Sequence, residues 1–167
     1  MRGIRLRPSG LVATVSVALA SLLLPAGPPV DVADASGRFS FSKPERCFMR
    51  KINLQRRAKG LRSLAWDRDL GYVARRHARQ IGAERSLRHD YNYGTEITGW
   101  RRLGQNTGRG GGCDSLFAAF MRSSSHRHNI LGRWRFMGVG VQRAGGRMYV
   151  QQVFEWKANP GNVYGTG

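Results

Sequence analysis

The stretch from Leu116 to Phe154 constrains the fold more than any other part of the chain. Apolar residues at helical spacing come first, and a run of three serines leads from them to His126. An Asn-Ile-Leu-Gly turn follows, and then two runs of β-type alternation meet at Gly145-Gly146, a pair that favours a two-residue hairpin loop. The pattern predicts a helix, a turn and an antiparallel hairpin. It places His126 where helix gives way to sheet, a position from which a rigid frame can present a side chain to a cleft.

Two helices are predicted upstream of this stretch. Residues 42–45 have the form of a capping box with proline in the first turn, so a helix should run from there to about Ala58. Asp67 can cap a second helix that ends near Glu84. His77 lies within the apolar stripe of that second helix, where we interpret it as a core histidine rather than a ligand.

The middle of the chain has weaker patterns. Residues 86–99 show no periodicity and are expected to form a loop, and 100–107 are expected to form a strand. Gly108 to Gly112 is interpreted as a glycine-rich loop, but the Gly-Lys-Ser/Thr of a phosphate-binding P-loop is absent. A further helix should begin at Cys113 or Asp114. Helices followed by a hairpin predict an α+β fold with a small antiparallel sheet that helices cover.

The first 35 residues have the features of a secretory signal peptide. Three arginines precede an apolar run from Leu11 to Leu24, and Ala33-Asp34-Ala35 offers a cleavage site. An uncleaved membrane anchor is the alternative, although the apolar run is short of the roughly 20 residues that span a bilayer. We therefore expect a secreted chain with a flexible arm at 36–43, one domain at 44–157 and a flexible tail at 158–167.

The chain is strongly basic, with a formal net charge of +18. Removal of residues 1–35 would take away three arginines and two aspartates and leave +17. Such an excess favours anionic partners, and cell-envelope polymers and acidic lipids are the ones expected of a secreted protein. No signature of a nucleic-acid-binding module is present, so no specific nucleic-acid partner is expected. Solubility combined with an arginine-rich composition is the other explanation of the charge.

Cys47 and Cys113 are the two cysteines of the chain. In an exported protein an even pair indicates a disulfide. It would close a loop of more than 60 residues and stabilise the fold by about 4 kcal/mol on the chain-entropy model. A catalytic thiol is the alternative, but no neighbouring pattern activates either cysteine.

Several separated blocks of residues extend over about residues 45–156. They are Asn53 with Arg57, Gly60-Leu61, Leu64, Trp66-Asp67, Leu70, Ala74, Ala78, His89, Leu103-Gly104-Gln105-Asn106, Phe120-Met121 to Leu131, Gly138-Val139-Gly140-Val141 and Phe154. In their types and order these blocks resemble the CAP superfamily of cysteine-rich secretory, antigen 5 and pathogenesis-related 1 proteins, also called SCP domains.

The resemblance implies a three-layer α-β-α sandwich and a cleft lined by two histidines and two acids, which bind zinc in some members. His89 and His126 match the two histidines, and Gln105 stands where the family usually has a glutamate. The fourth position finds no good match, since Asp114 fits it poorly. The change to Gln105 removes a carboxylate that could act as a base or balance a cation.

Three classes of function are compatible with these residues. The first is a secreted binding module whose cleft holds a lipid, a sterol or another small apolar or cell-envelope ligand. The second is a hydrolase that uses His126, with zinc held by His89 and His126. The third is a basic structural protein of the cell wall. Because a catalytic zinc usually has three protein ligands, we expect a metal-free site that binds rather than catalyses. We also expect the protein to be a monomer.

Overall fold

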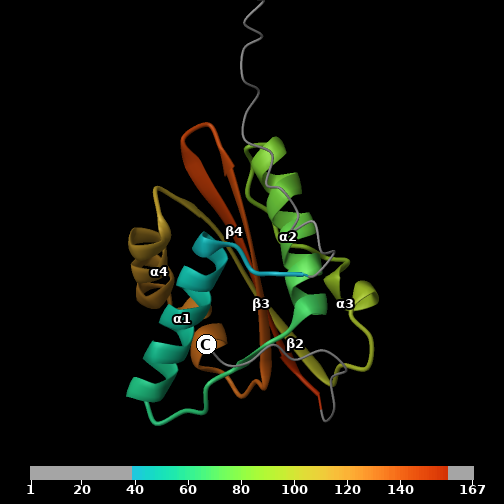
Figure 1. Ribbon diagram of the computed structural model, residues 1–167, viewed down its shortest axis with the longest axis vertical. Coiled ribbons are helices and arrows are strands. Elements are labelled where there is room, and N and C mark those ends of the chain that lie inside the picture. The colour runs from blue at the N-terminus through green and yellow to red at the C-terminus, as the bar shows by residue number, and fades with distance from the viewer. Residues whose placement is uncertain (1–38, 158–167) are drawn as a thin grey trace, which may run out of the picture. The chain divides into compact units, whose positions relative to one another are not determined.

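The computed structural model describes residues 39–157 (Figure 1). The expected signal peptide at 1–35, its cleavage site, the first residues of the expected arm and the tail at 158–167 lie outside the described residues. The helices and strands are α1 Lys43–Ala58, β1 Ala65–Trp66, α2 Arg68–Ala83, α3 Tyr93–Glu96, β2 Arg102–Gly110, α4 Cys113–Arg122, α5 Ser124–Leu131, β3 Phe136–Ala144 and β4 Arg147–Trp156.

The four strands form one sheet in the order β1-β3-β4-β2. β3 and β4 form the predicted hairpin around Gly145-Gly146, and β2 pairs antiparallel with β4. Both glycines have positive φ, which the tight turn requires. β1 pairs parallel with β3, with Ala65 opposite Phe136, so the sheet is mixed rather than purely antiparallel.

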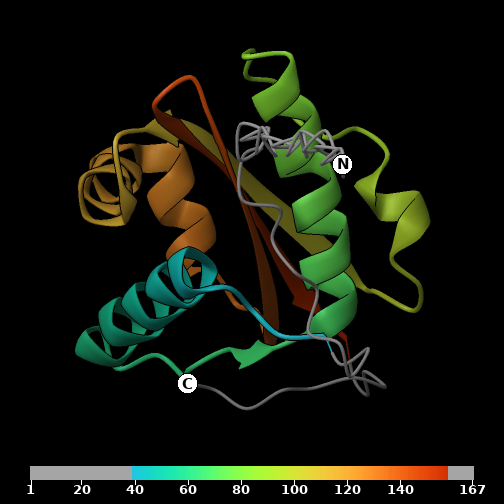
Figure 2. The ribbon, with the colours of Figure 1, turned by 45° about the horizontal axis from the view of Figure 1, so that its top comes forward.

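Helices cover both faces of the sheet, which confirms the predicted α+β sandwich (Figure 2). On one face, Phe48 and Ile52 of α1 and Phe120 of α4 form a core with Met137 and Phe154 of the strands. On the other face, the apolar side of α2 packs against the sheet. Burial of these side chains on both faces is the main force that holds the layers together.

Glycines in β3 allow α2 to lie directly on the sheet. A Cβ added at Gly140 would come within 2.2 Å of the backbone of Ala74, and one at Gly138 within 2.3 Å of the backbone of Gly71. Contacts this short do not occur between real atoms, so these two positions admit no side chain while α2 keeps its place. The Gly-Val-Gly-Val block therefore sets the helix-to-sheet distance.

The predicted helix starts are confirmed. Ser42 and Glu45 form a capping box, in which the Ser42 backbone N–H donates to Glu45 Oε2 at 2.7 Å. Asp67 caps α2 by accepting from the backbone N–H groups of Asp69 and Leu70 at 2.9 and 3.1 Å. Both caps use local contacts, which explains why the sequence pattern was sufficient to find them.

Three predictions for the middle of the chain are wrong. The segment with His126 and the Asn-Ile-Leu-Gly block is helical, because α5 extends from Ser124 to Leu131. The predicted loop from Gly108 to Gly112 begins too early, because β2 continues to Gly110. The loop at 86–99 contains the short helix α3.

Tertiary contacts account for these differences. Nη1 of the buried Arg56 donates to the carbonyls of Ile130 and Gly132, each at 2.8 Å, and thereby satisfies the C-terminal end of α5. A Cβ at Gly108 would lie 2.5 Å from the Phe120 ring, so glycine in this strand lets α4 pack closely on it. Neither contact has a signal in the local sequence.

The predicted disulfide is confirmed. Cys47 in α1 bonds to Cys113 at the start of α4, with 6.4 Å between their Cα atoms. It fastens together two helices on the same face of the sheet. Within residues 39–157, no helix combines the length and apolar character needed to cross a membrane.

Candidate functional site

His126 lies in the first turn of α5 rather than at a junction of helix and sheet. Its side chain is half-buried, and its ring centroid is 4.9 Å from that of Phe120. Nδ1 lies 2.9 Å from Oγ of Ser123, the residue at the N-cap of the helix. The serine that contacts the imidazole is therefore Ser123, one helical turn away, and not its sequence neighbour Ser125.

The surroundings of His126 favour the neutral imidazole. Burial lowers the pKa of His126, the nearby His89 lowers it further, and a hydrogen bond with the backbone of Thr107 raises it. No carboxylate contributes to this balance. His89 is thus near enough to influence the charge of His126, and His89 itself is exposed to solvent.

Gln105 uses its amide to hold the loop that follows α2. Its Oε1 accepts from the backbone N–H of Asp90 at 3.1 Å and from Gln151 Nε2 at 2.8 Å. Its Nε2 donates to the backbone carbonyl of Asp90 at 2.9 Å. An ionised carboxylate could not make this last bond, because it has no proton to donate. The amide thus matches both backbone groups of Asp90.

Successive residues of β2 serve opposite faces of the sheet. Gln105 stands opposite Val153, which belongs to the core beside α2. Asn106 points to the other face, where its Nδ2 donates to the backbone carbonyl of His126 at 3.1 Å and to Gln152 Oε1 at 3.0 Å. Among the described residues, no hydrogen bond joins Gln105 to either His89 or His126. The sequence-predicted set of three therefore separates into a histidine pair and a glutamine brace.

Sequence reasoning missed the two asparagines that position α5. Asn129 Nδ2 donates to Asn106 Oδ1 at 2.9 Å and to the backbone carbonyl of Gln105 at 2.8 Å. Asn106 is fully buried, and together these bonds tie the helix that carries His126 to β2. Both residues lie within the blocks that resemble the family, Leu-Gly-Gln-Asn and His-Arg-His-Asn. That shared placement was the signal that could have identified them.

Replacement of Gln105 by glutamate is expected to destabilise the protein by about 1–3 kcal/mol at neutral pH. Gln105→Glu removes the donor to the Asp90 carbonyl and places an oxygen against it. Chemical denaturation of the variant and the parent protein measures this difference.

The matched control is Gln80→Glu, which makes the same change of charge on the exposed side of α2. Gln80 Oε1 accepts from Arg76 Nη1 at 3.3 Å, a contact that a carboxylate would keep. We expect its stability to stay within about 0.5 kcal/mol of the parent. Equal effects of the two substitutions would show that the Asp90 brace contributes nothing specific.

The structure also places three other candidate residues. His128 is exposed. Asp114 is also exposed, and its Oδ1 forms an ion pair with Lys51 Nζ at 2.6 Å. His77 is buried, as predicted for a core histidine, and its Nε2 lies 2.8 Å from the backbone carbonyl of Arg88.

The donor set around His126 does not fit a zinc site. Gln105 has its amide oxygen engaged by Asp90 and Gln151. Residues 39–157 contain no group of three or more histidine, cysteine, aspartate or glutamate side chains placed to hold a metal ion. Two imidazoles alone fall short of the three protein ligands that a catalytic zinc usually has. We therefore derive no chemistry that passes through a metal.

Solved structures with a similar fold come from several bacteria. An outer surface protein of Borrelia burgdorferi is 16% identical with a TM-score of 0.63, and the match covers 68% of this chain and 92% of that one. An extracellular protein with an SCP domain from Bacillus anthracis is 22% identical with a TM-score of 0.59, over 72% of this chain and 45% of that one.

A cysteine-rich secretory protein from Staphylococcus aureus is 23% identical with a TM-score of 0.57, over 68% of this chain and 38% of that one. The present chain thus spans less than half of the Bacillus and Staphylococcus proteins. At these identities the likeness concerns the fold alone. Comparison with curated proteins finds no significant match.

The family model for CAP, the cysteine-rich secretory protein family, matches residues 49–155. This range includes most of α1, every later element except the last residue of β4, and His89, Gln105 and His126. The chain therefore belongs to the CAP family.

Proposed function

We propose that this protein is a secreted CAP module that holds a small envelope-derived ligand beside His89 and His126 without transforming it. The observation that carries the proposal is the engagement of Gln105 by Asp90 and Gln151. Gln105 stands where the family usually has a glutamate, and its amide cannot accept a proton as a general base would. Asp90 is also unsuited to that role, because its carboxylate pairs with Arg76.

The chemistry around His126 suits an amphiphilic ligand such as a lipid or a sterol. The lowered pKa keeps its imidazole neutral at pH 7, and the ring packs on the buried Phe120. A neutral imidazole can donate to or accept from a hydroxyl or headgroup. A site of this kind orients a ligand without needing a charge on it.

Secretion is part of the proposal. The features of residues 1–35 support it. The solved structures of similar fold are those of an outer surface, an extracellular and a secretory protein, which agrees with it.

The test is to extract and analyse the lipids that copurify with the protein from its native export route. We expect His126→Ala to lower the amount of bound lipid at least about tenfold, while Leu54→Ala on the exposed side of α1 leaves it unchanged. Absence of any copurifying or reconstituted lipid in both the parent and the Leu54 variant would contradict the proposal.

Hydrolysis is the second candidate, and the Ser123–His126 contact favours it. The 2.9 Å between Ser123 Oγ and His126 Nδ1 is within the reach of a nucleophile and its base. Ester turnover that is lost in both Ser123→Ala and His126→Ala would replace the binding proposal with this one. No carboxylate influences the pKa of His126, so the imidazole lacks the acid that would orient it as a base. Hydrolysis is therefore the weaker candidate.

Retention on anionic envelope polymers is a further role that the composition favours. It follows from the net charge of +18 and does not depend on the histidine pair. Both roles can belong to one protein, since one uses a cleft and the other a charged surface.

A further inference from the structure

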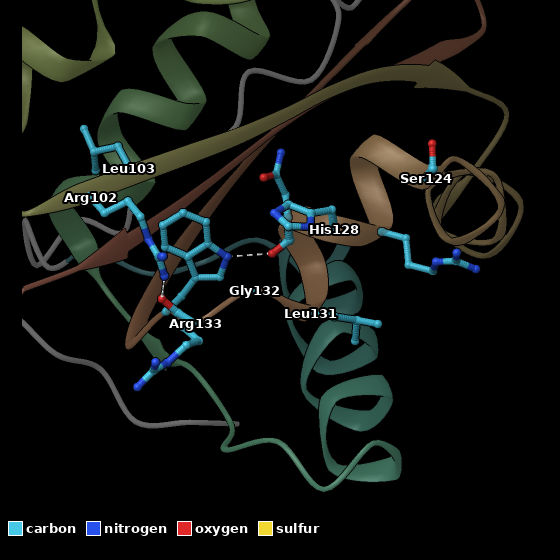
Figure 3. Close-up of a pocket in the computed structure, with 10 residues that line it drawn as sticks. Arg102, Leu103, Ser124, His128, Leu131, Gly132 and Arg133 are labelled. Atoms are coloured by element: carbon cyan, nitrogen blue, oxygen red, sulfur yellow. Dashed lines mark hydrogen bonds between the residues drawn. The ribbon is translucent and has the colours of Figure 1, made fainter.

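A concave site lies on the opposite side of α5 from His126. It is an open groove of about 720 Å³ between α5, the start of β2 and the segment that leads into β3. Figure 3 shows Arg102 and Arg133 toward one end of it, Ser124 toward the other and His128 between them. Three arginines, one histidine and one tryptophan dominate its lining: Arg102, Arg127, His128, Arg133 and Trp134.

The helical period separates this groove from the histidine pair. Ser124, Arg127, His128 and Leu131 line the groove, and the spacing i, i+3, i+4, i+7 places them on one face of α5. His126 falls on the reverse face at 100° per residue. Occupancy of the groove is therefore independent of the site beside Phe120.

No acid balances the charge of the groove. No carboxylate lines it. Among residues 39–157, every carboxylate except that of Asp67 pairs with a base, and none of those bases lines the groove. The positive charge of Arg102, Arg127 and Arg133 is thus uncompensated within the described part of the chain.

Arg102 is held in a fixed orientation. Its guanidinium carbon lies 4.4 Å from the centroid of the Trp134 ring, and its Nη2 donates to the carbonyl of Arg133. Trp134 is buried, and its Nε1 donates to the carbonyl of Asn129 at 2.7 Å. A Cβ at Gly104 would lie 2.8 Å from the indole, so the glycine lets the ring rest on β2.

This arrangement leaves donors for a ligand. Within residues 39–157, Arg102 Nε and Nη1 have no hydrogen-bond partner of their own. A guanidinium with a fixed plane and free N–H groups is suited to bidentate binding of a phosphate. Because its position is already set by Trp134, less entropy is lost when it binds.

We propose that the groove binds the phosphate groups of an anionic, phosphate-linked polymer. Its arginines come from three segments, β2, α5 and the link to β3, so they can meet successive phosphates rather than one. Its volume also exceeds what a single phosphate would fill. The inference gives the proposed envelope retention a discrete site, and it does not depend on ligand binding beside His126.

The test uses a short linear inorganic polyphosphate and the full secreted chain. Affinity is measured by calorimetry at several salt concentrations for Arg127→Gln combined with Arg133→Gln. We expect affinity to fall at least about tenfold. The slope of log K against log salt should become shallower by roughly one for each arginine removed.

The matched control removes two exposed arginines from the tip of the β3–β4 hairpin, Arg143→Gln with Arg147→Gln. We expect it to reduce affinity less than about threefold, by the general charge effect alone. Equal losses in the two double variants would overturn the discrete site. Salt-sensitive retention of both variants on envelope material would then leave the broader charge-based role standing.

Arg102→Lys tests the positioned guanidinium, because it keeps the charge and removes the planar fork. We expect about a fivefold loss of polyphosphate affinity with an unchanged thermal midpoint. Affinity equal to the parent would contradict the role given to Arg102.

Two further probes distinguish the source of the phosphate. If inorganic phosphate binds as tightly as polyphosphate, the polymer part of the proposal is wrong. If the double groove variant loses binding to phosphatidylglycerol vesicles while keeping its polyphosphate affinity, the groove recognises lipid headgroups and the proposal is overturned.

Discussion

Replacing Cys47 and Cys113 together by serine is expected to lower the free energy of unfolding by about 4 kcal/mol. The bond joins residues 66 apart, so its loss releases a long loop in the unfolded chain. In the folded state the same bond holds α1 against α4. Urea denaturation of the variant and the parent under non-reducing conditions measures the difference.

Reduction supplies the control for this prediction. The parent in excess reductant should unfold at the urea concentration of the double serine variant, and the variant should not respond to reductant. A loss below about 1 kcal/mol would mean that the unfolded chain already restricts this loop in other ways.

The stability of this protein is expected to fall as pH rises from about 4.5 to 7, by about 3 kcal/mol from Glu155 alone. Burial raises the pKa of Glu155 from 4.5 to about 7; the nearby Lys157 opposes this rise and Asp67 adds to it. Between these values the folded state binds a proton that the unfolded state has released. The contribution is therefore complete below pH 4.5 and is lost as the pH passes through 7.

Glu155→Gln isolates this effect. At pH 8 the variant is expected to be more stable than the parent by up to about 3 kcal/mol, because the parent then holds a charged carboxylate in a fully buried position, with Lys157 Nζ no closer than 3.5 Å to Oε1. At pH 4 the two proteins should be nearly equal. Stability is measured by urea denaturation across this pH range.

Glu84→Gln is the matched control, since this carboxylate is exposed and pairs with Arg88, four residues further along the chain. Its effect should stay within about 0.5 kcal/mol at both pH values. A Glu155→Gln variant whose difference from the parent does not change with pH would contradict the prediction.

Features that depend on neighbours in the chain were predictable. The capping box at Ser42, the Asp67 cap and the Gly145-Gly146 turn are each formed by residues a few positions apart, and the two long helices follow from their apolar spacing. The alternation in 137–141 and 150–156 identified the two central strands for the same reason. These signals were sufficient for the α+β class.

Features that depend on distant partners were not predictable from local pattern. Arg56 is buried and bonds to carbonyls more than 70 residues away, whereas its neighbour Arg57, which matches the family block, is exposed. The sequence of α5 has little apolar periodicity, and Ile130 is the one buried residue of this helix. Its helical state depends on Arg56, Asn106 and Asn129, which are contributed by three different elements.

The sequence by itself determined the family blocks, the disulfide pair, the ends of the long helices and the identity of His89, Gln105 and His126 as residues of interest. The tertiary structure alone decided how those three are arranged. Adjacent residues of a strand face opposite sides of a sheet, so Gln105 braces Asp90 on the side of α2 while Asn106 holds the His126 helix on the other. It also decided that Arg102, Arg127 and Arg133 converge on one groove, because scattered charges acquire a common direction only when the chain is folded.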